Sequence, residues 1–237
     1  MSASLYFDKI GSLLAEIKAA ELPVIQLLGG SIGQSIASGG IVHLFGSGHS
    51  HMAANEVFVR AGTITAVRAI WPRQETDKLE RVEGLGDAVL KFGDVRPGEY
   101  LFVFSHSGIN PMPIDVALAA KRRGAVTVAV GSKAHSLSVP GRHSNGKRLF
   151  EACDYFIDTH VPAGDALLAE ASFPYAYGPA STAAFVTIIQ AVMAEAVHWM
   201  LENGFDPPVR VSRNMPGGDE RNDRLGELYK HRIPELG

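Results

Sequence analysis

The stretch YLFVFSHSGINPMPIDVALAAKRRGAVTVAV, residues 100–130, contains two apolar, β-rich runs with a helical pattern between them. The apolar runs are residues 100–104 and 125–130, and the helical pattern covers residues 114–123 before Gly124, a typical C-cap residue. A connection of this length suits one right-handed crossover between parallel strands. The stretch therefore predicts a β-α-β unit, which is the repeating element of a parallel sheet covered by helices on both faces.

Further apolar runs continue this alternation along the chain. They occupy residues 41–45, 65–70 and 154–158, which gives five expected strands separated by segments that can form helices. We therefore expect a three-layer, flavodoxin-like α/β fold, in which a five-stranded parallel sheet of order 2-1-3-4-5 is flanked by helices.

Helical patterns precede and follow these strands. Apolar residues recur at helical spacing on both sides of Pro23, which predicts two N-terminal helices, the second ending at Gly39-Gly40. A last long helix is expected over residues 181–203, before Gly204 and two prolines.

The chain shows no internal repeat and no clear domain boundary. We expect residues 1–205 to form a single domain that includes the N-terminal helices. Residues 206–237 are rich in charge and are expected to form a C-terminal arm or lid, with a short helix near residues 220–231.

The composition is that of a soluble globular enzyme, with 237 residues, 46% of them apolar and 20% charged. A net charge of −3 argues against a nucleic-acid partner, and the short basic run at residues 142–148 is interpreted as a solvated loop. The single cysteine, Cys153, allows no internal disulfide and favours the cytoplasm. Uncharged apolar runs are too short to span a membrane, so no membrane partner is expected.

Two loops rich in serine and glycine follow the first and third expected strands: GSGHS at residues 46–50 and SHSGIN at residues 105–110. In the order 2-1-3-4-5 these strands are neighbours at the point where ligands bind to open α/β sheets, so the loops should converge. Each loop leads into a helix whose free N–H groups favour an anion. The two loops therefore predict a phosphate site, although glycine and serine also serve in ordinary turns.

Other phosphate motifs do not fit the first loop. A dinucleotide fingerprint requires a third glycine where His51 stands, and an acidic residue at the end of the next strand, where the sequence reads RAIW. A nucleotide P-loop requires Gly-Lys-Ser/Thr, which is absent here. The expected ligand of the first loop is therefore neither a dinucleotide nor a nucleotide bound by a P-loop.

The two loops, together with GPAST at residues 178–182, resemble the sugar isomerase (SIS) domain over residues 8–205. The resemblance implies the flavodoxin-like fold, a phosphorylated sugar as ligand, and assembly as a homodimer or homotetramer with the site near a subunit interface. It also implies which side chains hold the ligand. Those bound to the phosphate would be Ser50, Ser105, Ser107 and Asn110, and those lining the sugar site would be Ser181 and Thr182.

Further polar residues of the two loops are candidates for ligand binding. Ser47 adds a hydroxyl to the first loop, and His49, His51 and His106 cluster around both loops. As imidazolium groups they would complement a phosphate dianion, and one of them could open the sugar ring or act as acid or base. Alternatively, they are solvent-facing residues at helix starts.

Interconversion of an aldose and a ketose requires a base that moves a proton and a group that polarises the carbonyl. Glu56 follows Ser50 by six residues, roughly 9 Å along a helix, and is the candidate base. The alternative is a surface glutamate paired with Arg60 one turn later.

Gln190 and His198 lie eight residues apart in the last helix, an angular offset near 80°, so both can face one cavity. Sedoheptulose-7-phosphate isomerases have a similar Gln-x7-His pair as metal ligand and acid/base, although this chain has Glu56 and Arg60 where that branch has His and Glu. The resemblance makes His198 a catalytic candidate. Zinc held by Glu56, Gln190 and His198 is chemically reasonable but not required, and a packed histidine beside Trp199 is the alternative.

We therefore expect a cytoplasmic enzyme that binds a phosphorylated sugar and isomerises it through an enediol, with no required cofactor. The alternatives are a lyase of the N-acetylmuramic acid 6-phosphate etherase type and a non-catalytic sugar-phosphate sensor. Three further residues that follow strands, Arg73, Glu75 and Asp165, could reach the sugar, and a loop salt bridge is the alternative for the first two.

Overall fold

A five-stranded parallel sheet forms the centre of the chain, which a computed structural model describes over residues 2–70 and 76–237. The strand order is β2-β1-β3-β4-β5, so the expected topology is confirmed. The strands are β1 (Val42–Gly46), β2 (Val67–Ala69), β3 (Tyr100–Phe104), β4 (Val126–Gly131) and β5 (Tyr155–Asp158). The stretch that contains Arg73 and Glu75 lies outside the described residues.

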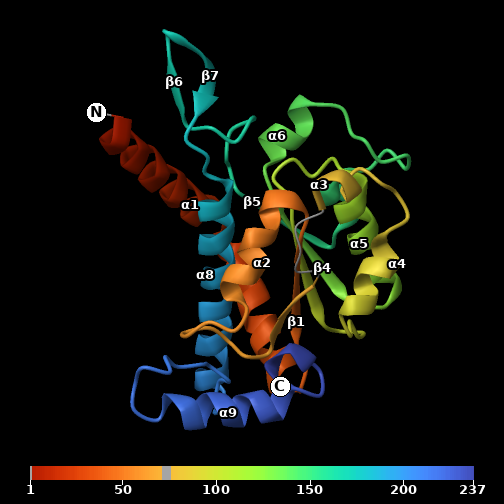
Figure 1. The fold of residues 1–237 in the computed structure, drawn as a ribbon, viewed down its shortest axis with the longest axis vertical. Coiled ribbons are helices and arrows are strands. Elements are labelled where there is room, and N and C mark those ends of the chain that lie inside the picture. Colours follow the sequence, from red (N-terminus) through yellow and green to blue (C-terminus); the bar gives the residue numbers. More distant parts are fainter. Residues whose placement is uncertain (1, 71–75) are drawn as a thin grey trace.

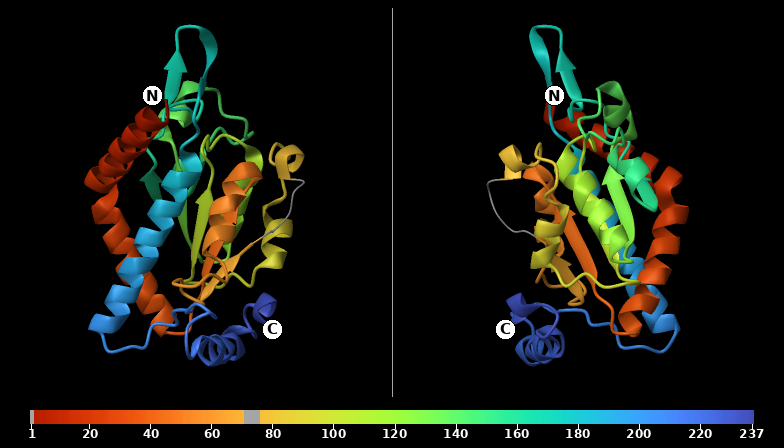
Figure 2. Two further views of the ribbon diagram at one scale, coloured as in Figure 1. Left: turned by 60° about the vertical axis from the view of Figure 1, so that its left-hand side comes forward. Right: turned by 90° about the vertical axis from the view of Figure 1, so that its right-hand side faces the viewer.

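Helices cover both faces of the sheet (Figures 1 and 2). On one face lie α1 (Ser2–Ala37), α2 (His51–Val57) and α8 (Ser181–Glu202), packed on Phe102 and Phe104 of β3. On the other face, α5 (Pro111–Arg122) packs on the alternate residues of the same strand. Since successive side chains of a strand point to opposite faces, both faces of β3 are apolar and buried.

The observed helix α5 begins three residues before the helix expected at residues 114–123. The remaining helices are mostly short. They are α3 (Thr76–Leu79), α4 (Gly86–Val89), α5 (Pro111–Arg122), α6 (Lys133–Ser138), α7 (Leu149–Ala152) and α9 (Gly218–Tyr229), with 3₁₀ turns η1 (Gly48–Ser50), η2 (Leu90–Phe92) and η3 (Pro234–Leu236).

The prediction of two N-terminal helices separated at Pro23 was wrong, because α1 continues through this proline. Pro23 is exposed, whereas Ile17 before it and Ile25 after it are both buried in the same core. Beyond the proline, α1 packs closely on α8, since a Cβ at Gly29 would lie only 2.4 Å from the Cβ of Glu195. This tertiary packing offsets the local cost of a proline inside a helix.

The long helix α8 is confirmed within one residue of its expected end. Among the described residues it is the helix that is long and apolar enough to cross a membrane. However, its apolar residues, including Phe185 and Ile189, are buried against α1 and the sheet. The apolar character of α8 is therefore that of a core helix.

A β-hairpin was not anticipated from the sequence. It is formed by β6 (Leu168–Glu170) and β7 (Phe173–Tyr177), which pair antiparallel and extend from the body beside the N-terminal end of α1 (Figure 1). Phe173 and Tyr175 remain 50% and 70% exposed. With few buried positions, this segment lacks the apolar pattern by which the core strands could be recognised.

The C-terminal segment lies at the amino-terminal edge of the sheet, opposite the serine-rich loops (Figure 1). The helix expected near residues 220–231 is present as α9. After it, Arg232 is buried and donates to Asp94 and Glu99 in the loop before β3. Polar contacts therefore fix this end of the chain.

Candidate functional site

The two serine-rich loops converge, as expected, at the carboxyl ends of β1 and β3. Gly46 at the end of β1 is opposite Phe104 at the end of β3. The Glu80 carboxylate then joins the loops, because it accepts from Ser47 Oγ at 3.3 Å and from Asn110 Nδ2 at 2.7 Å. The structure thus brings Ser47 and Asn110 together at the position where open α/β sheets bind ligands.

Glycines shape the first loop. A Cβ at Gly46 would lie 2.6 Å from the carbonyl of Ser50, and Gly48 has a φ of +55°. The chain can therefore turn sharply and enter α2 directly. Ser50 is half-buried and His49 is exposed at this turn.

The second loop is held by its own serine. Ser105 Oγ accepts from the Gly108 backbone N–H at 3.1 Å, and Ser107 is half-buried beside them. Asn110 is 6% exposed and precedes α5, whose Met112 N–H donates to the Glu80 carbonyl at 3.1 Å. Glu80 thus contacts the start of α5 through both its backbone and its side chain.

A cavity of about 540 Å³ opens beside the second loop. Ser107 and Asn110 line it together with three residues that sequence reasoning missed as site residues: Glu80, His135 and Arg142. Arg142 Nη1 donates to Asn110 Oδ1 at 2.6 Å. The Asn110 amide therefore lies between a carboxylate and a guanidinium at the edge of a cavity.

The basic run at residues 142–148 is partly tied to the protein, which differs from the expected solvated loop. The Glu83 carboxylate accepts from the backbone N–H and the hydroxyl of Ser144, at 2.7 Å and 2.6 Å. His143 Nε2 lies 3.1 Å from the Asp115 carboxylate. These contacts place Arg142 in the wall of the cavity. The acidic residues Glu80 and Glu83 were the feature of the sequence that could have indicated a contact with this basic run.

Burial disfavours the charged form of two histidines at these loops. Burial lowers the pKa of His51 and lowers the pKa of His106 to about 4. The two ring nitrogens of His106 are buried without a hydrogen-bond partner among the described residues, and the ring meets His135 edge-on at 4.5 Å. An imidazolium of His51 or His106 facing a phosphate, as considered from the sequence, is therefore disfavoured in the ligand-free chain.

Asp165 caps the start of α8. Its carboxylate accepts from the backbone N–H groups of Ala180 and Ser181, at 3.0 Å and 2.8 Å, and from Ser181 Oγ at 2.6 Å. The Ser181 hydroxyl, which is 7% exposed, is thus engaged inside the protein, whereas Thr182 next to it is half-buried. Burial lowers the pKa values of His106 and His135, and the negative charge of Asp165 partly opposes this effect. The carboxylate that caps α8 therefore lies close enough to the second loop to act on His106.

The proposed base and metal ligands do not line the cavity. Glu56, near the end of α2, forms an ion pair with Arg60, which lies beyond the end of that helix, and this pairing is the alternative considered above. His198 is 62% exposed and pairs with Glu202 at 3.3 Å, about 25 Å along the α8 axis from Ser181 at 1.5 Å per residue. Gln190 is half-buried midway along the same helix.

These positions do not assemble a metal centre within one chain. Over residues 2–70 and 76–237, no group of three or more His, Cys, Asp or Glu side chains is placed to hold a metal ion. Glu56 and His198 each have a charged partner four residues later in the chain instead. The described residues of one chain therefore do not fit the zinc site considered from the sequence.

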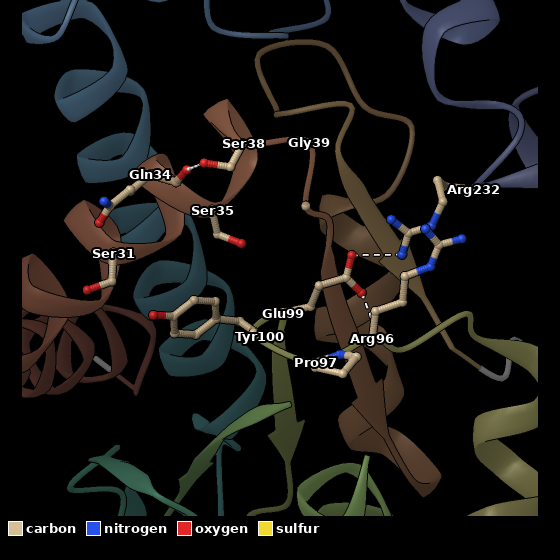
Figure 3. Close-up of a pocket in the computed structure, with 12 residues that line it drawn as sticks. Ser31, Gln34, Ser35, Ser38, Gly39, Arg96, Pro97, Glu99, Tyr100 and Arg232 are labelled. Atoms are coloured by element: carbon tan, nitrogen blue, oxygen red, sulfur yellow. Dashed lines mark hydrogen bonds and ion pairs between the residues drawn. The ribbon is translucent and has the colours of Figure 1, made fainter. Parts of the chain in front are cut away.

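A second cavity, of about 590 Å³, lies at the amino-terminal edge of the sheet (Figure 3). It is lined by serines at the end of α1 and by Arg96, Glu99 and Arg232. Charges here satisfy one another: the Glu99 carboxylate accepts from Arg232 Nη2 at 2.7 Å and from the Arg96 backbone N–H at 2.9 Å, and it lies 2.9 Å from His43 Nε2. Both its position and its internal pairing indicate a structural network.

Among solved structures, those similar to this chain include a phosphoheptose isomerase from Francisella tularensis, with a TM-score of 0.56 and 13% identity over 82% of this chain and 96% of that one. The Vibrio vulnificus NanR protein complexed with ManNAc-6P has a TM-score of 0.54 and 12% identity, over 99% and 70% of the two chains. At these identities the likeness shows the fold alone.

Several proteins have amino-acid sequences that are more similar to this chain than those of the solved structures above. A UPF0309 protein of Geobacillus kaustophilus is 42% identical over 98% of this chain and 95% of its own length. A UPF0309 protein of Halalkalibacterium halodurans is 33% identical over 94% of this chain and 95% of its own length. The SIS domain family matches residues 5–132. The five-stranded sheet, the two joined serine loops and these matches together show that the chain belongs to the SIS domain family and to its UPF0309 proteins.

Proposed function

We propose that the chain binds a phosphorylated sugar at the carboxyl edge of the sheet and interconverts its aldose and ketose forms. The observation that carries this proposal is the 540 Å³ cavity beside two serine loops that a carboxylate joins at the switch point. Structural neighbours include phosphoheptose isomerases and a protein complexed with ManNAc-6P. The loops supply the hydroxyl and backbone donors that a phosphate needs.

In this proposal the phosphate is held by Ser50, Ser105 and Ser107, and the sugar extends into the cavity past Asn110, whose amide contacts Glu80 and Arg142. Ser107 and Asn110 line the cavity directly, and Ser105 holds the turn that contains them. Glu80, His135 and Arg142 face the same space, so groups able to transfer protons and stabilise charge surround the sugar. No group in this account requires a metal.

Deuterium exchange tests this function directly. The chain would be incubated in deuterated water with aldose and ketose phosphates of five to seven carbons, and each sugar without its phosphate would be tested alongside. Proton NMR would show deuterium entering C1 or C2 of the phosphorylated substrate, because enediol formation exposes that proton to solvent. Unphosphorylated sugars should exchange far more slowly.

The same experiment separates the alternatives. Exchange accompanied by loss of a β-substituent would identify a lyase, in which the base removes a proton and a neighbouring group leaves. Tight binding of a sugar phosphate without exchange would identify a sensor. Either result would contradict isomerisation.

We further propose that the chain acts as a homodimer or homotetramer. The exposed aromatic side chains Phe173 and Tyr175 on the projecting hairpin support an interface there, because such residues are enriched where proteins associate. Light scattering after gel filtration should give a mass of at least twice 25.4 kDa. Replacing both aromatics with serine should shift it to the monomer, and a wild-type monomer would refute the proposal.

A further inference from the structure

The side-chain amide of Asn110 holds two opposite charges at the cavity. Its Nδ2 donates to Glu80 Oε1 at 2.7 Å, and its Oδ1 accepts from Arg142 Nη1 at 2.6 Å. Only one orientation of the amide satisfies both contacts, since a carboxylate cannot donate and a guanidinium cannot accept. Because Asn110 is almost completely buried, it fixes the relative position of the carboxylate and the guanidinium.

Both charged groups face the space in which the sugar is proposed to lie. Glu80 and Arg142 line the 540 Å³ cavity together with Ser107, which belongs to the proposed phosphate loop. Glu80 is also held from the first loop by Ser47 Oγ. A ligand anchored by its phosphate at the loops would thus present its carbonyl end to a carboxylate and a cation.

We propose that Glu80 is the carboxylate that transfers the proton during isomerisation and that Arg142 stabilises the oxygen on which negative charge develops. This inference rests on the proposed function and names the residues that perform it. Two properties suit the pair to these roles. A carboxylate is a base that can accept and return one proton, and a guanidinium is a permanent cation that pairs with oxyanions.

The proposed step is balanced without a further reactant. Glu80 takes the proton from the carbon next to the carbonyl of the aldose, and the electron pair of that C–H bond becomes the C=C bond of the enediolate. The carbonyl π pair moves to its oxygen, where Arg142 stabilises the charge. The hydroxyl proton on the second carbon passes to that oxygen, Glu80 returns its proton to the first carbon, and the ketose forms.

The other carboxylates near the loops are engaged differently. Glu56 pairs with Arg60 outside the cavity lining. Glu83 follows Glu80 on the same segment, but its two oxygens accept from Ser144. Asp165 accepts three hydrogen bonds at the start of α8. Glu80 is therefore the described carboxylate that combines access to the cavity with contact to both loops.

The test compares Glu80→Gln with Glu80→Asp, Arg142→Gln and the remote variant Glu227→Gln. Glu227 lies on the exposed face of α9 and pairs with Lys230, so its variant makes the same change of charge far from the cavity. For each protein, the deuterium exchange rate is measured on the best wild-type substrate. Calorimetry measures the affinity for the corresponding polyol phosphate, which has no carbonyl and cannot react.

We expect Glu80→Gln to lower the exchange rate by about 100-fold or more and Arg142→Gln by about 100-fold, as for loss of a general base and of an oxyanion partner. Polyol phosphate should bind Glu80→Gln within a few-fold of wild type, which also shows that the variant is folded. Glu80→Asp should retain part of the exchange, because it keeps a displaced carboxylate. Glu227→Gln should match wild type.

The possible failures are distinguishable. If wild type exchanges no sugar phosphate, the proposed isomerisation is wrong and the role of Glu80 is wrong with it. If wild type exchanges and Glu80→Gln exchanges equally fast, Glu80 is not the base while the function stands. Equal loss of exchange and of polyol phosphate affinity in Glu80→Gln would make Glu80 a binding residue, which also overturns its assignment as base.

Discussion

The two edges of the sheet contain similar polar residues but differ in how these residues are engaged. At the amino-terminal edge, Glu99 and Arg232 are buried and satisfy each other and their neighbours. At the carboxyl edge, Glu80 and Arg142 both contact Asn110, and they line an open cavity. Charge and cavity volume are thus similar at both edges, and the edges differ in that Glu99 and Arg232 contact each other whereas Glu80 and Arg142 line the cavity on either side of Asn110.

The largest expected effect on stability comes from breaking the amino-terminal network. Glu99→Ala removes the carboxylate that contacts His43 and leaves Arg232 with Asp94 as its remaining described ion-pair partner, and loss of one partner of a buried ion pair costs up to about 3–5 kcal/mol of unfolding free energy. Urea denaturation measures this loss, with Asp87→Ala, in an exposed ion pair, as the control that should change little. A change under about 1 kcal/mol for Glu99→Ala would show that the network is not structural.

The serines at the other edge should affect binding more than stability. Ser105→Ala combined with Ser107→Ala removes two hydroxyls expected to bond the phosphate, each worth about 1.5 kcal/mol or more toward a charged group, so affinity should fall about 100-fold. Calorimetry with a polyol phosphate and the free polyol measures the difference. Equal weakening of both ligands would contradict the phosphate role.

Asp165 provides a smaller, local effect at the same edge. Asp165→Ala removes the acceptor for two backbone N–H groups at the start of α8, and loss of such a cap costs about 1–2 kcal/mol of unfolding free energy. Thermal and urea unfolding would measure it, and Ser181→Ala, which removes one contact of the cap, should cost less. The reverse order would indicate that Asp165 is not primarily a cap.

Stability should also depend on pH through His106. Its pKa is lowered by burial to about 4 from an ordinary value of 6.5, so between these values the unfolded chain binds more protons than the folded one. The unfolding free energy is therefore expected to fall as the pH decreases through this window, by at most about 1.4 kcal/mol per pH unit from this group. Burial also lowers the pKa of His43, which acts in the same direction.

His106→Asn measures the contribution of this group. Urea denaturation at several pH values between 7 and 4 should show a shallower loss of stability in the variant than in wild type. Parallel curves for the two proteins would mean that His106 is not held neutral by burial.

The smallest effect is expected at Glu56. Its ion pair with Arg60 is exposed, so Glu56→Gln should change the unfolding free energy by only about 0.2–1 kcal/mol. The deuterium exchange rate of the same variant tests the comparison with Glu80. Loss of exchange in Glu56→Gln with normal exchange in Glu80→Gln would return the role of base to Glu56.

Much of the fold could be predicted from the sequence because it depends on local patterns. The five apolar runs predict the sheet, and the loops after residues 45 and 104 predict the edge at which we propose that the ligand binds. The continuity of α1 could not be predicted, because Pro23 favours a break locally and only packing on α8 offsets it. The β6–β7 hairpin lacks a buried face and therefore lacks the alternation that identifies a strand.

The candidate site was only partly predictable for a related reason. Ser107 and Asn110 belong to a recognisable loop, whereas Glu80 and Arg142 lie in segments without a motif and reach the cavity through tertiary contacts. The spacing of Gln190 and His198 correctly places both on one helix. It does not show that His198 is exposed at the end far from the serine loops.

The most direct test of the account is a crystal structure of the chain with a bound sugar phosphate or polyol phosphate. We expect phosphate density between the loops at residues 46–50 and 105–110, with the carbon chain directed toward Glu80 and Arg142. Density for the ligand in the cavity beside Arg96 and Ser35, with the serine loops empty, would contradict it.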